Sequence, residues 1–181
     1  MTDLKQKSIA TLMVIEGGYS DNKDDSGGKT RWGVTEEVAR RHGYQGKMSE
    51  LPQTVAAKIY TTEYWDSLNL NAIEGICPAI AEELFDTGVN LGTYRAATFL
   101  QRSLNVLNLK QGIYKDIKVD GKLGYQSLLA LMAYRDARGD EGLIVLHRAL
   151  NCLQGAFYIE LTERREKDET FIYGWLLNRV V

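Results

Sequence analysis

One glutamate stands where its carboxyl group could remain protonated near neutral pH. Glu16 follows Ile9 by seven residues and Leu12 by four, so it extends the apolar face of a helix predicted over residues 3–16. The pair Gly17-Gly18 would end this helix, and the negative end of the helix dipole disfavours a carboxylate there. Partial burial acts in the same direction, so we expect a raised pKa. Cleavage of a glycosidic bond requires such a proton donor.

The segment after this helix carries groups that can assist the same reaction. Asp25 follows Glu16 by nine residues, and Thr30 follows Asp25 by five. A second carboxylate or an oriented hydroxyl can position water or stabilise positive charge on a sugar ring. A structural turn is the alternative interpretation of this Asp- and Gly-rich segment. A calcium loop is excluded because Gly33 falls where the bidentate glutamate should lie.

Three short runs in this region resemble the amino-terminal signature of glycoside hydrolase family 108, which comprises N-acetylmuramidases, many of them phage endolysins. These runs are Ile15-Glu16-Gly17-Gly18-Tyr19, then Asp25-Ser26-Gly27-Gly28-Lys29-Thr30, then Trp32-Gly33-Val34-Thr35, with Ser26 in place of the usual proline. The resemblance implies that Glu16 is the catalytic acid. The Asp and Thr of a lysozyme-like arrangement then fall on Asp25 and Thr30.

Further matches to the family extend over nearly the whole chain, and three residues are candidate substrate contacts. The matches are Ile59-Tyr60, Tyr64-Trp65, Phe85-Asp86, Val89-Asn90-Leu91-Gly92 and Phe171-Ile172-Tyr173-Gly174-Trp175. Tyr19 lies beside Glu16 in the sequence, and Tyr64 is an aromatic residue that could contact sugar. Asn90 could hydrogen-bond an acetamido group, with helix capping as the alternative. Most aromatic residues at helical spacing, Phe171 and Trp175 included, are expected to pack in the core, with a sugar platform as the alternative.

The second half of the chain contains a pattern that resembles the helix-turn-helix of peptidoglycan-binding modules. It consists of Leu100-Gln101-Arg102-Ser103-Leu104-Asn105 followed by Val119-Asp120-Gly121-Lys122-Leu123-Gly124-Tyr125-Gln126-Ser127. Asp120-Gly121 predicts a tight turn, and Ser127 is predicted to cap the next helix. These structural roles explain the pattern without direct sugar binding, so both interpretations stay open.

Helix start and stop signals dominate the sequence and predict an all-α fold without strands. The family resemblance implies that this fold is lysozyme-like. After the first helix, the expected helices run from Thr35 to His42-Gly43, after Pro52 through Trp65, from Pro78 towards Asn90, over 93–107, over 126–135, from Asp140 towards Glu166, and around Phe171–Leu176. We expect a catalytic lobe over 1–91 and a helical lobe over 92–181. The two would flank a cleft and pack as a single domain.

Composition and motifs exclude several classes of protein. A net charge of -2 and a pI near 5.8 argue against a dedicated nucleic-acid binder, although an anionic polymer could dock on the mildly basic second half. His42 and His147 are the only histidines, and no His-Glu-x-x-His motif exists for a zinc amidase. Cys77 and Cys152 suit neither a disulfide framework nor a zinc site. No metal or organic cofactor is implied.

These observations lead to one functional hypothesis and two alternatives. The hypothesis is an N-acetylmuramidase of the endolysin type, cleaving the bond between N-acetylmuramic acid and N-acetylglucosamine during host cell lysis. The alternatives are a lytic transglycosylase acting on the same bond and a non-catalytic wall-binding or secretion-associated protein. The apolar run over 9–15 is too short for a membrane anchor, and no signal peptide is recognised. We therefore expect a monomer made in the host cytoplasm, exported through a holin pore and acting on peptidoglycan in the periplasm.

Overall fold

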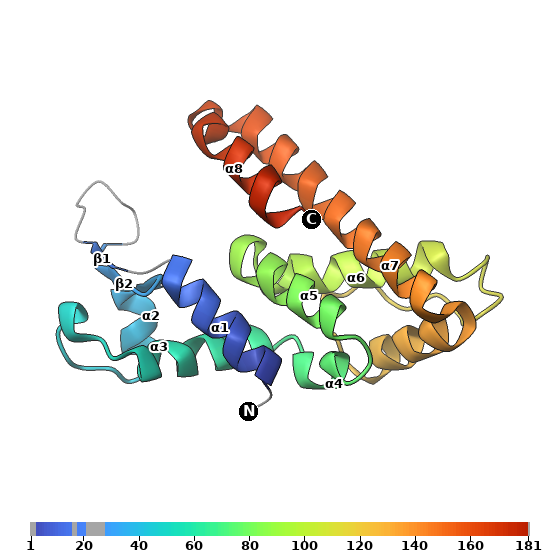
Figure 1. Ribbon diagram of the computed structural model, residues 1–181, viewed down its shortest axis with the longest axis horizontal. Helices are drawn as coiled ribbons and strands as arrows, with labels where there is room; N and C mark the ends of the chain where they lie inside the picture. The colour runs from blue at the N-terminus through green and yellow to red at the C-terminus, as the bar shows by residue number, and fades with distance from the viewer. Residues whose placement is uncertain (1–2, 16–17, 21–27, 181) are drawn as a thin grey trace. The chain divides into compact units, whose positions relative to one another are not determined.

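The computed structural model describes residues 3–15, 18–20 and 28–180, and their contacts divide the chain into two compact units (Figure 1). The first unit is Met1–Ser67 and the second is Leu68–Val181. Most of the described residues are helical, and the strands form one small sheet. The prediction of a predominantly helical fold is therefore confirmed. No helix in the described ranges is both long and apolar enough to cross a membrane.

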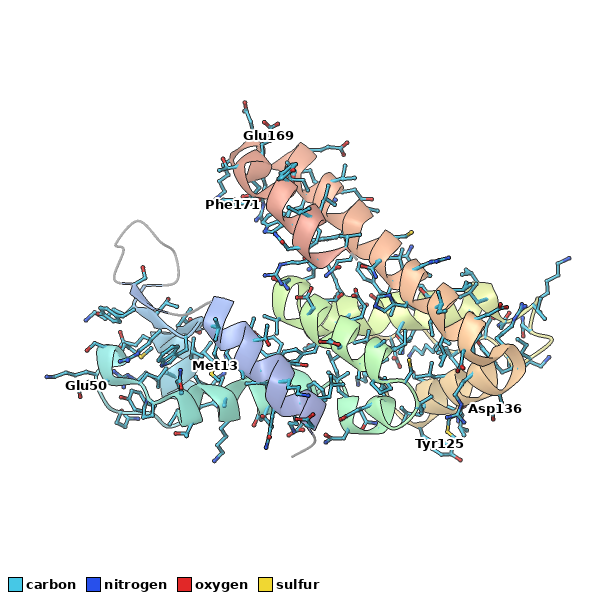
Figure 2. The ribbon with its side chains drawn as sticks, in the orientation of Figure 1. Met13, Glu50, Tyr125, Asp136, Glu169 and Phe171 are labelled. Carbon is cyan, nitrogen blue, oxygen red and sulfur yellow. The ribbon has the colours of Figure 1, made fainter. Side chains whose placement is uncertain are left out.

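The first unit combines short helices with a three-stranded sheet. Its elements are α1 (Asp3–Ile15), β1 (Tyr19–Ser20), β2 (Thr30–Arg31), β3 (Val34–Thr35), α2 (Glu36–Arg41), the 3-10 turn η1 (Met48–Glu50), α3 (Gln53–Tyr60) and the π-helical turn η2 (Thr61–Asp66). Helix α1 packs against α3 and buries Ile9 and Leu12, as the apolar spacing predicts. Trp65 is fully buried in this core. Figure 2 shows Met13 on α1 and Glu50 on η1.

The sheet corrects the prediction of a fold without strands. Its three strands are antiparallel in the order β1-β2-β3, with Ser20 opposite Thr30 and Arg31 opposite Val34. Between β2 and β3, Trp32 and Gly33 both have positive φ angles, 54° and 70°, which is the geometry of a tight hairpin turn. Each strand has only two residues. Such strands are too short to show the alternation of apolar and polar residues that identifies a strand in a sequence.

Local signals define several helix ends correctly. Thr35 is the N-cap of α2 and accepts a hydrogen bond from the backbone N–H of Val38 at 3.3 Å. The helix predicted after Pro52 differs, because α3 ends at Tyr60 and the chain continues as η2 through Trp65. A π-helical turn has the same apolar content as an α-helix, so the sequence pattern does not separate the two.

The second unit consists of helices and one long connection. Its elements are α4 (Leu70–Glu74), α5 (Pro78–Leu91), α6 (Thr93–Leu107), α7 (Tyr125–Arg164), the 3-10 turn η3 (Glu166–Asp168) and α8 (Glu169–Arg179). Helix α5 contacts α4, α6 and α7, and α8 folds back along the end of α7 (Figure 1). The fully buried side chains at this centre are mainly leucine and isoleucine, including Leu84, Leu100, Leu104, Leu131 and Leu146.

Helix α7 contains a break that separates two helical segments. Gly139 has φ 61° and ψ -157°, which no residue inside an α-helix adopts. The hydroxyl of Tyr134 donates to the carbonyl of Gly142 at 2.8 Å and bridges the break. The sequence predicts two helices with a gap before Asp140, and the break at Gly139 confirms that division.

The last helix corrects an expectation about aromatic packing. Phe171 is one of the aromatic residues of which most are expected in the core, but it is 55% exposed at the start of α8 (Figure 2). It stacks against Trp175, with ring centroids 6.0 Å apart, and Trp175 in turn contacts buried Tyr158. Helix α8 contacts its neighbours along one side only, so helical spacing of aromatic residues does not by itself indicate burial.

Candidate active site and carbohydrate-binding elements

Of the three predicted catalytic residues, the structure describes Thr30 and the helix that precedes Glu16. Glu16 and Asp25 lie outside the described residues. Helix α1, which is described up to Ile15, is fixed at its other end by an ion pair between Lys5 and Asp66 at 2.9 Å. The Lys5 side chain is almost fully buried and its ammonium also lies 5.9 Å from the ring centroid of Trp65. These contacts anchor the helix that precedes Glu16.

Tyr19 and Thr30 lie on adjacent strands, but their side chains point to opposite faces of the sheet, because Tyr19 is opposite Arg31 and Thr30 is opposite Ser20. Thr30 lies in β2, half-buried, and its hydroxyl donates to the carbonyl of Gly28 at 3.3 Å. Tyr19 lies in β1 opposite Arg31, with 44% of its side chain exposed. The hairpin therefore places a hydroxyl and an exposed aromatic ring within one small sheet.

Trp32, which lies in the third signature run but is not among the predicted site residues, anchors this hairpin. The indole N–H of Trp32 donates to the carbonyl of Leu51 at 2.9 Å, and the carbonyl of Trp32 accepts from the hydroxyl of Tyr60 at 2.9 Å. The guanidinium of Arg31 lies 5.2 Å from the Trp32 ring. The turn between β2 and β3 is thus tied to η1 and α3, which fixes the position of Thr30.

A depression of about 300 Å³ adjoins the sheet. Tyr19, Lys29, Glu36, Arg40 and the segment 45–49 line it. Arg40 is held rigidly, because its guanidinium donates to the carbonyls of Tyr44 and Gly46 and pairs with Glu36 at 2.7 Å. The exposed ring of Tyr19 could stack against a sugar, and the polar side chains around it could hydrogen-bond its hydroxyl groups.

Tyr64 lies in η2 and is half-buried. Its ring contacts that of Tyr60, with centroids 5.8 Å apart, and burial raises the pKa of its hydroxyl. The neighbouring Glu63 accepts from His42 at 2.6 Å and pairs with Arg41 at 3.2 Å, and the hydrogen bond with His42 lowers the pKa of Glu63. These contacts connect η2 to α2, and the role of Tyr64 in binding substrate stays a prediction.

Asn90 lies in α5 of the second unit, where its amide nitrogen bonds within the helix. It donates to the backbone carbonyl and to the carboxylate of Asp86, at 2.8 and 3.1 Å. The carboxylate of Asp86 also accepts from Arg179 of α8 at 2.6 Å and from Gln154 of α7 at 2.9 Å. Gly92, not Asn90, ends the helix. A contact between Asn90 and an acetamido group stays a prediction.

The predicted turn at Asp120-Gly121 exists, and a buried glutamine organises it. Gln101 of α6 accepts from the backbone N–H groups of Asp120 and Gly121 at 3.0 and 2.9 Å, and donates to the Asp120 carboxylate and the Lys122 carbonyl, both at 3.0 Å. Gly121 has φ 73° and lies against the ring of Tyr94, where a Cβ atom would clash. Glycine is therefore required at this position.

Ser127 does not cap the following helix, contrary to the prediction. Helix α7 begins at Tyr125, so Ser127 lies inside its first turn and is buried. Its hydroxyl donates to the carbonyl of Lys122 and accepts from the Gln101 amide, both at 3.4 Å. The helix starts one residue earlier than expected, at Tyr125, and Gly124 is its extended N-cap.

Comparison with known proteins identifies both parts of the chain. Residues 9–92 match the family profile described as glycosyl hydrolase 108. This segment is therefore similar to glycosyl hydrolases of family 108. Residues 95–180 match a profile described as a predicted peptidoglycan domain. Together the two matches describe a peptidoglycan-degrading enzyme of the glycoside hydrolase class.

The profiles and the contacts divide the chain at different places. The profiles meet between residues 92 and 95, whereas the compact units meet between Ser67 and Leu68. Helices α4 and α5 therefore belong to the glycosyl hydrolase segment and pack within the second unit. The functional division into residues 1–91 and 92–181 stays a prediction.

A solved structure resembles the whole chain. Brucella abortus SagA aligns with a TM-score of 0.57 and 20% sequence identity, over 98% of this chain and 98% of its own. At this identity the likeness concerns the fold alone. No curated protein sequence gave a significant match.

A buried carboxyl group in the second unit predicts pH-dependent stability. Glu83 on α5 is 6% exposed, accepts from Thr87 at 3.2 Å and lies 3.8 Å from His147. Burial, together with the charge of Asp86, raises the pKa of Glu83 to about 7. The folded chain keeps this proton up to that pH, whereas the unfolded chain releases it near 4.5. The stabilising contribution is therefore present below pH 4.5 and is lost as the pH rises through 7.

Glu83→Gln should remove this loss of stability. We expect the variant and the parent protein to have similar free energies of unfolding at pH 4.5, with the variant more stable by about 2 kcal/mol at pH 8. Burial lowers the pKa of His147, so its titration changes the stability in the opposite direction. Both proteins contain His147, so its contribution to the free energy of unfolding is removed when one protein is compared with the other. Urea denaturation followed by circular dichroism measures the free energy of unfolding of both proteins at the two pH values. Glu141→Gln, at an exposed position of α7, should show no such difference between the two pH values.

Proposed function

We propose that this enzyme is an N-acetylmuramidase that hydrolyses the bond between N-acetylmuramic acid and N-acetylglucosamine. The match of residues 9–92 to glycosyl hydrolase 108 carries the proposal, since the glutamate of the family signature falls on Glu16. Two features of the described residues support it. Helix α1, which leads to Glu16, is anchored by Lys5, and the hairpin that follows is anchored by Trp32.

In this proposal, Glu16 donates a proton to the glycosidic oxygen while the bond to the anomeric carbon breaks. Positive charge develops on the sugar ring, and water attacks the anomeric carbon and passes a proton to a carboxylate, either Asp25 or the now ionised Glu16. Asp25 stabilises the charge or orients the water, and Thr30 assists it through its hydroxyl. That hydroxyl donates to Gly28, so its oxygen remains able to accept a hydrogen bond from water.

The substrate contacts follow the same hypothesis. Tyr19 would contact the sugar beside the depression near β1, and Tyr64 and Asn90 are further candidate contacts. The biological role would be host cell lysis by a monomer that reaches the wall through a holin pore. No bound metal or organic cofactor is part of the mechanism.

The chemistry of the new chain ends tests the proposed reaction. We expect sacculi digested to completion to carry reducing N-acetylmuramic acid ends, because Asp25 and Thr30 can hold water at the anomeric carbon. Reduction with borohydride followed by mass spectrometry resolves these ends. Muropeptides lighter by one water and resistant to reduction would instead show a lytic transglycosylase. Binding to sacculi without any cleavage would show a wall-binding protein.

A further inference from the structure

A groove of about 680 Å³ lies entirely within the second unit. The connection 114–122 forms one wall, the first turns of α7 form the other, and Gln101 of α6 lies at its base. Its volume falls in the range of ligand sites, roughly 300 to 1,000 Å³. The groove is therefore large enough for a short peptide segment or a disaccharide.

Hydrogen bonds to α6 hold the wall formed by the connection in place. Asn105 donates to the carbonyl of Ile117 at 2.8 Å and accepts from its N–H at 2.9 Å. One turn earlier on α6, Gln101 holds the segment from Asp120 to Lys122. The hydroxyl of Tyr114 donates to the carbonyl of Leu104 at 2.7 Å. This wall lacks regular secondary structure but is fixed along its length.

The wall formed by the connection carries three exposed lysines. Lys115, Lys118 and Lys122 are exposed, and none forms an ion pair within the described part of the chain. The two carboxylates in the groove are already hydrogen-bonded. Asp116 accepts from Asn108 at 2.6 Å, and Asp120 accepts from Gln101 and from the backbone N–H of Lys122. Lys118 and Lys122 also act on Asp120, because their charges add to the hydrogen bond from Gln101 in lowering the pKa of its carboxyl. The three lysines still outnumber the two carboxylates of the groove, so positive charge remains for a ligand with carboxylates.

The opposite wall offers an apolar surface. Tyr125 and Leu129 are 70% and 40% exposed, and Ala133 continues the same face of α7 at the next four-residue step. Figure 2 shows Tyr125 at the outer surface of the first turn of α7. Lysines facing a strip of apolar side chains suit a ligand that combines carboxylates with small hydrophobic groups.

We propose that this groove binds the peptide stems of peptidoglycan and not its glycan strands. The stems contain alanine and acidic residues, and their amino end is consumed in the amide bond to the lactyl group, so carboxylates exceed ammonium groups. The N-acetylated sugars are uncharged and offer the lysines no ionic partner. Carboxylates of the stem would pair with Lys118 and Lys122, and its methyl groups would contact Leu129. The proposal rests on peptidoglycan as the substrate of this enzyme.

Charge reversal in the groove tests the proposal. The full chain carries Glu16→Gln so that sacculi stay intact, and its binding is measured by co-sedimentation with sacculi that lack teichoic acids. We expect Lys118→Glu with Lys122→Glu to weaken binding about tenfold. Lys110→Glu with Lys167→Glu changes the charge equally at exposed positions outside the groove and should leave binding unchanged. Circular dichroism confirms that all variants fold.

Two further samples distinguish the stems from the glycan. An N-acetylmuramoyl-L-alanine amidase removes the stems together with the cross-links, so it releases soluble glycan strands that carry one lactyl carboxylate per N-acetylmuramic acid. These strands are therefore added as competitors, and they should displace the Glu16→Gln chain from intact sacculi less than the stem peptide does. The free tetrapeptide L-Ala-γ-D-Glu-diaminopimelate-D-Ala should compete for intact sacculi. Displacement by the stem-free strands equal to that by the tetrapeptide, or equal binding by the charge-reversed variant, would overturn the proposal. Failure of the muramidase proposal appears separately, in the products that the unaltered enzyme releases.

Discussion

Replacing Glu16 by glutamine should lower the rate of peptidoglycan cleavage about a hundredfold or more while leaving the fold intact. Glutamine has nearly the same volume as glutamate but cannot donate the proton that the leaving oxygen needs. General acid catalysis typically contributes a factor of about 10² to 10⁴, so its removal should dominate every other single change in the chain. The rate is measured as release of soluble fragments from purified sacculi, and the circular dichroism spectrum and melting temperature should match those of the parent enzyme.

A second glutamate of the same unit provides the matched control. Glu37 lies on α2 with an exposed side chain and does not line the depression next to the sheet. Glu37→Gln removes the same charge and should retain full activity. A Glu16→Gln variant that keeps more than about a tenth of the parent rate, a change in barrier below about 1.4 kcal/mol, would contradict the assignment of Glu16.

The sequence predicts helices best where one strong signal marks each end. Pro78 begins α5 and Gly92, with φ 90°, ends it, as expected from the fixed φ of proline and the freedom of glycine. Helix α6 has the predicted bounds, Thr93–Leu107, because its leucines, alanines and phenylalanine recur on one face. In both helices the local backbone preference and the tertiary packing favour the same structure.

The hairpin and the groove depend on contacts between residues distant in sequence, which local patterns do not reveal. Trp32 adopts a positive φ because its indole and its carbonyl are held by Leu51 and Tyr60, 19 and 28 residues away. Gln101 lies within a recognised motif, but nothing in the motif indicates that its amide bonds to a turn 19 residues later. The catalytic roles of Glu16, Asp25 and Thr30 rest on the family signature and stay predictions.

Gln101→Leu should destabilise the second unit by about 3 kcal/mol. Leucine fills a similar volume but leaves the N–H groups of Asp120 and Gly121 without their partner and frees the turn from α6. Gln101 is only 1% exposed, so its place is not readily taken by water. Leaving a buried polar group unsatisfied costs about 1 to 3 kcal/mol, and two backbone amides lose their partner together. Urea denaturation followed by circular dichroism gives the change in unfolding free energy.

Ser103→Ala on the same helix separates the loss of hydrogen bonds from the loss of a buried polar side chain. Ser103 is 2% exposed, and its hydroxyl has no hydrogen-bond partner among the described residues. Removing that hydroxyl should leave the stability unchanged or raise it slightly, because no bond is lost and a buried polar group disappears. If Gln101→Leu were as neutral as Ser103→Ala, the turn at Asp120-Gly121 would hold its shape without α6. The connection 114–122, which carries the lysines of the groove, would then be held in place by contacts other than those of Gln101.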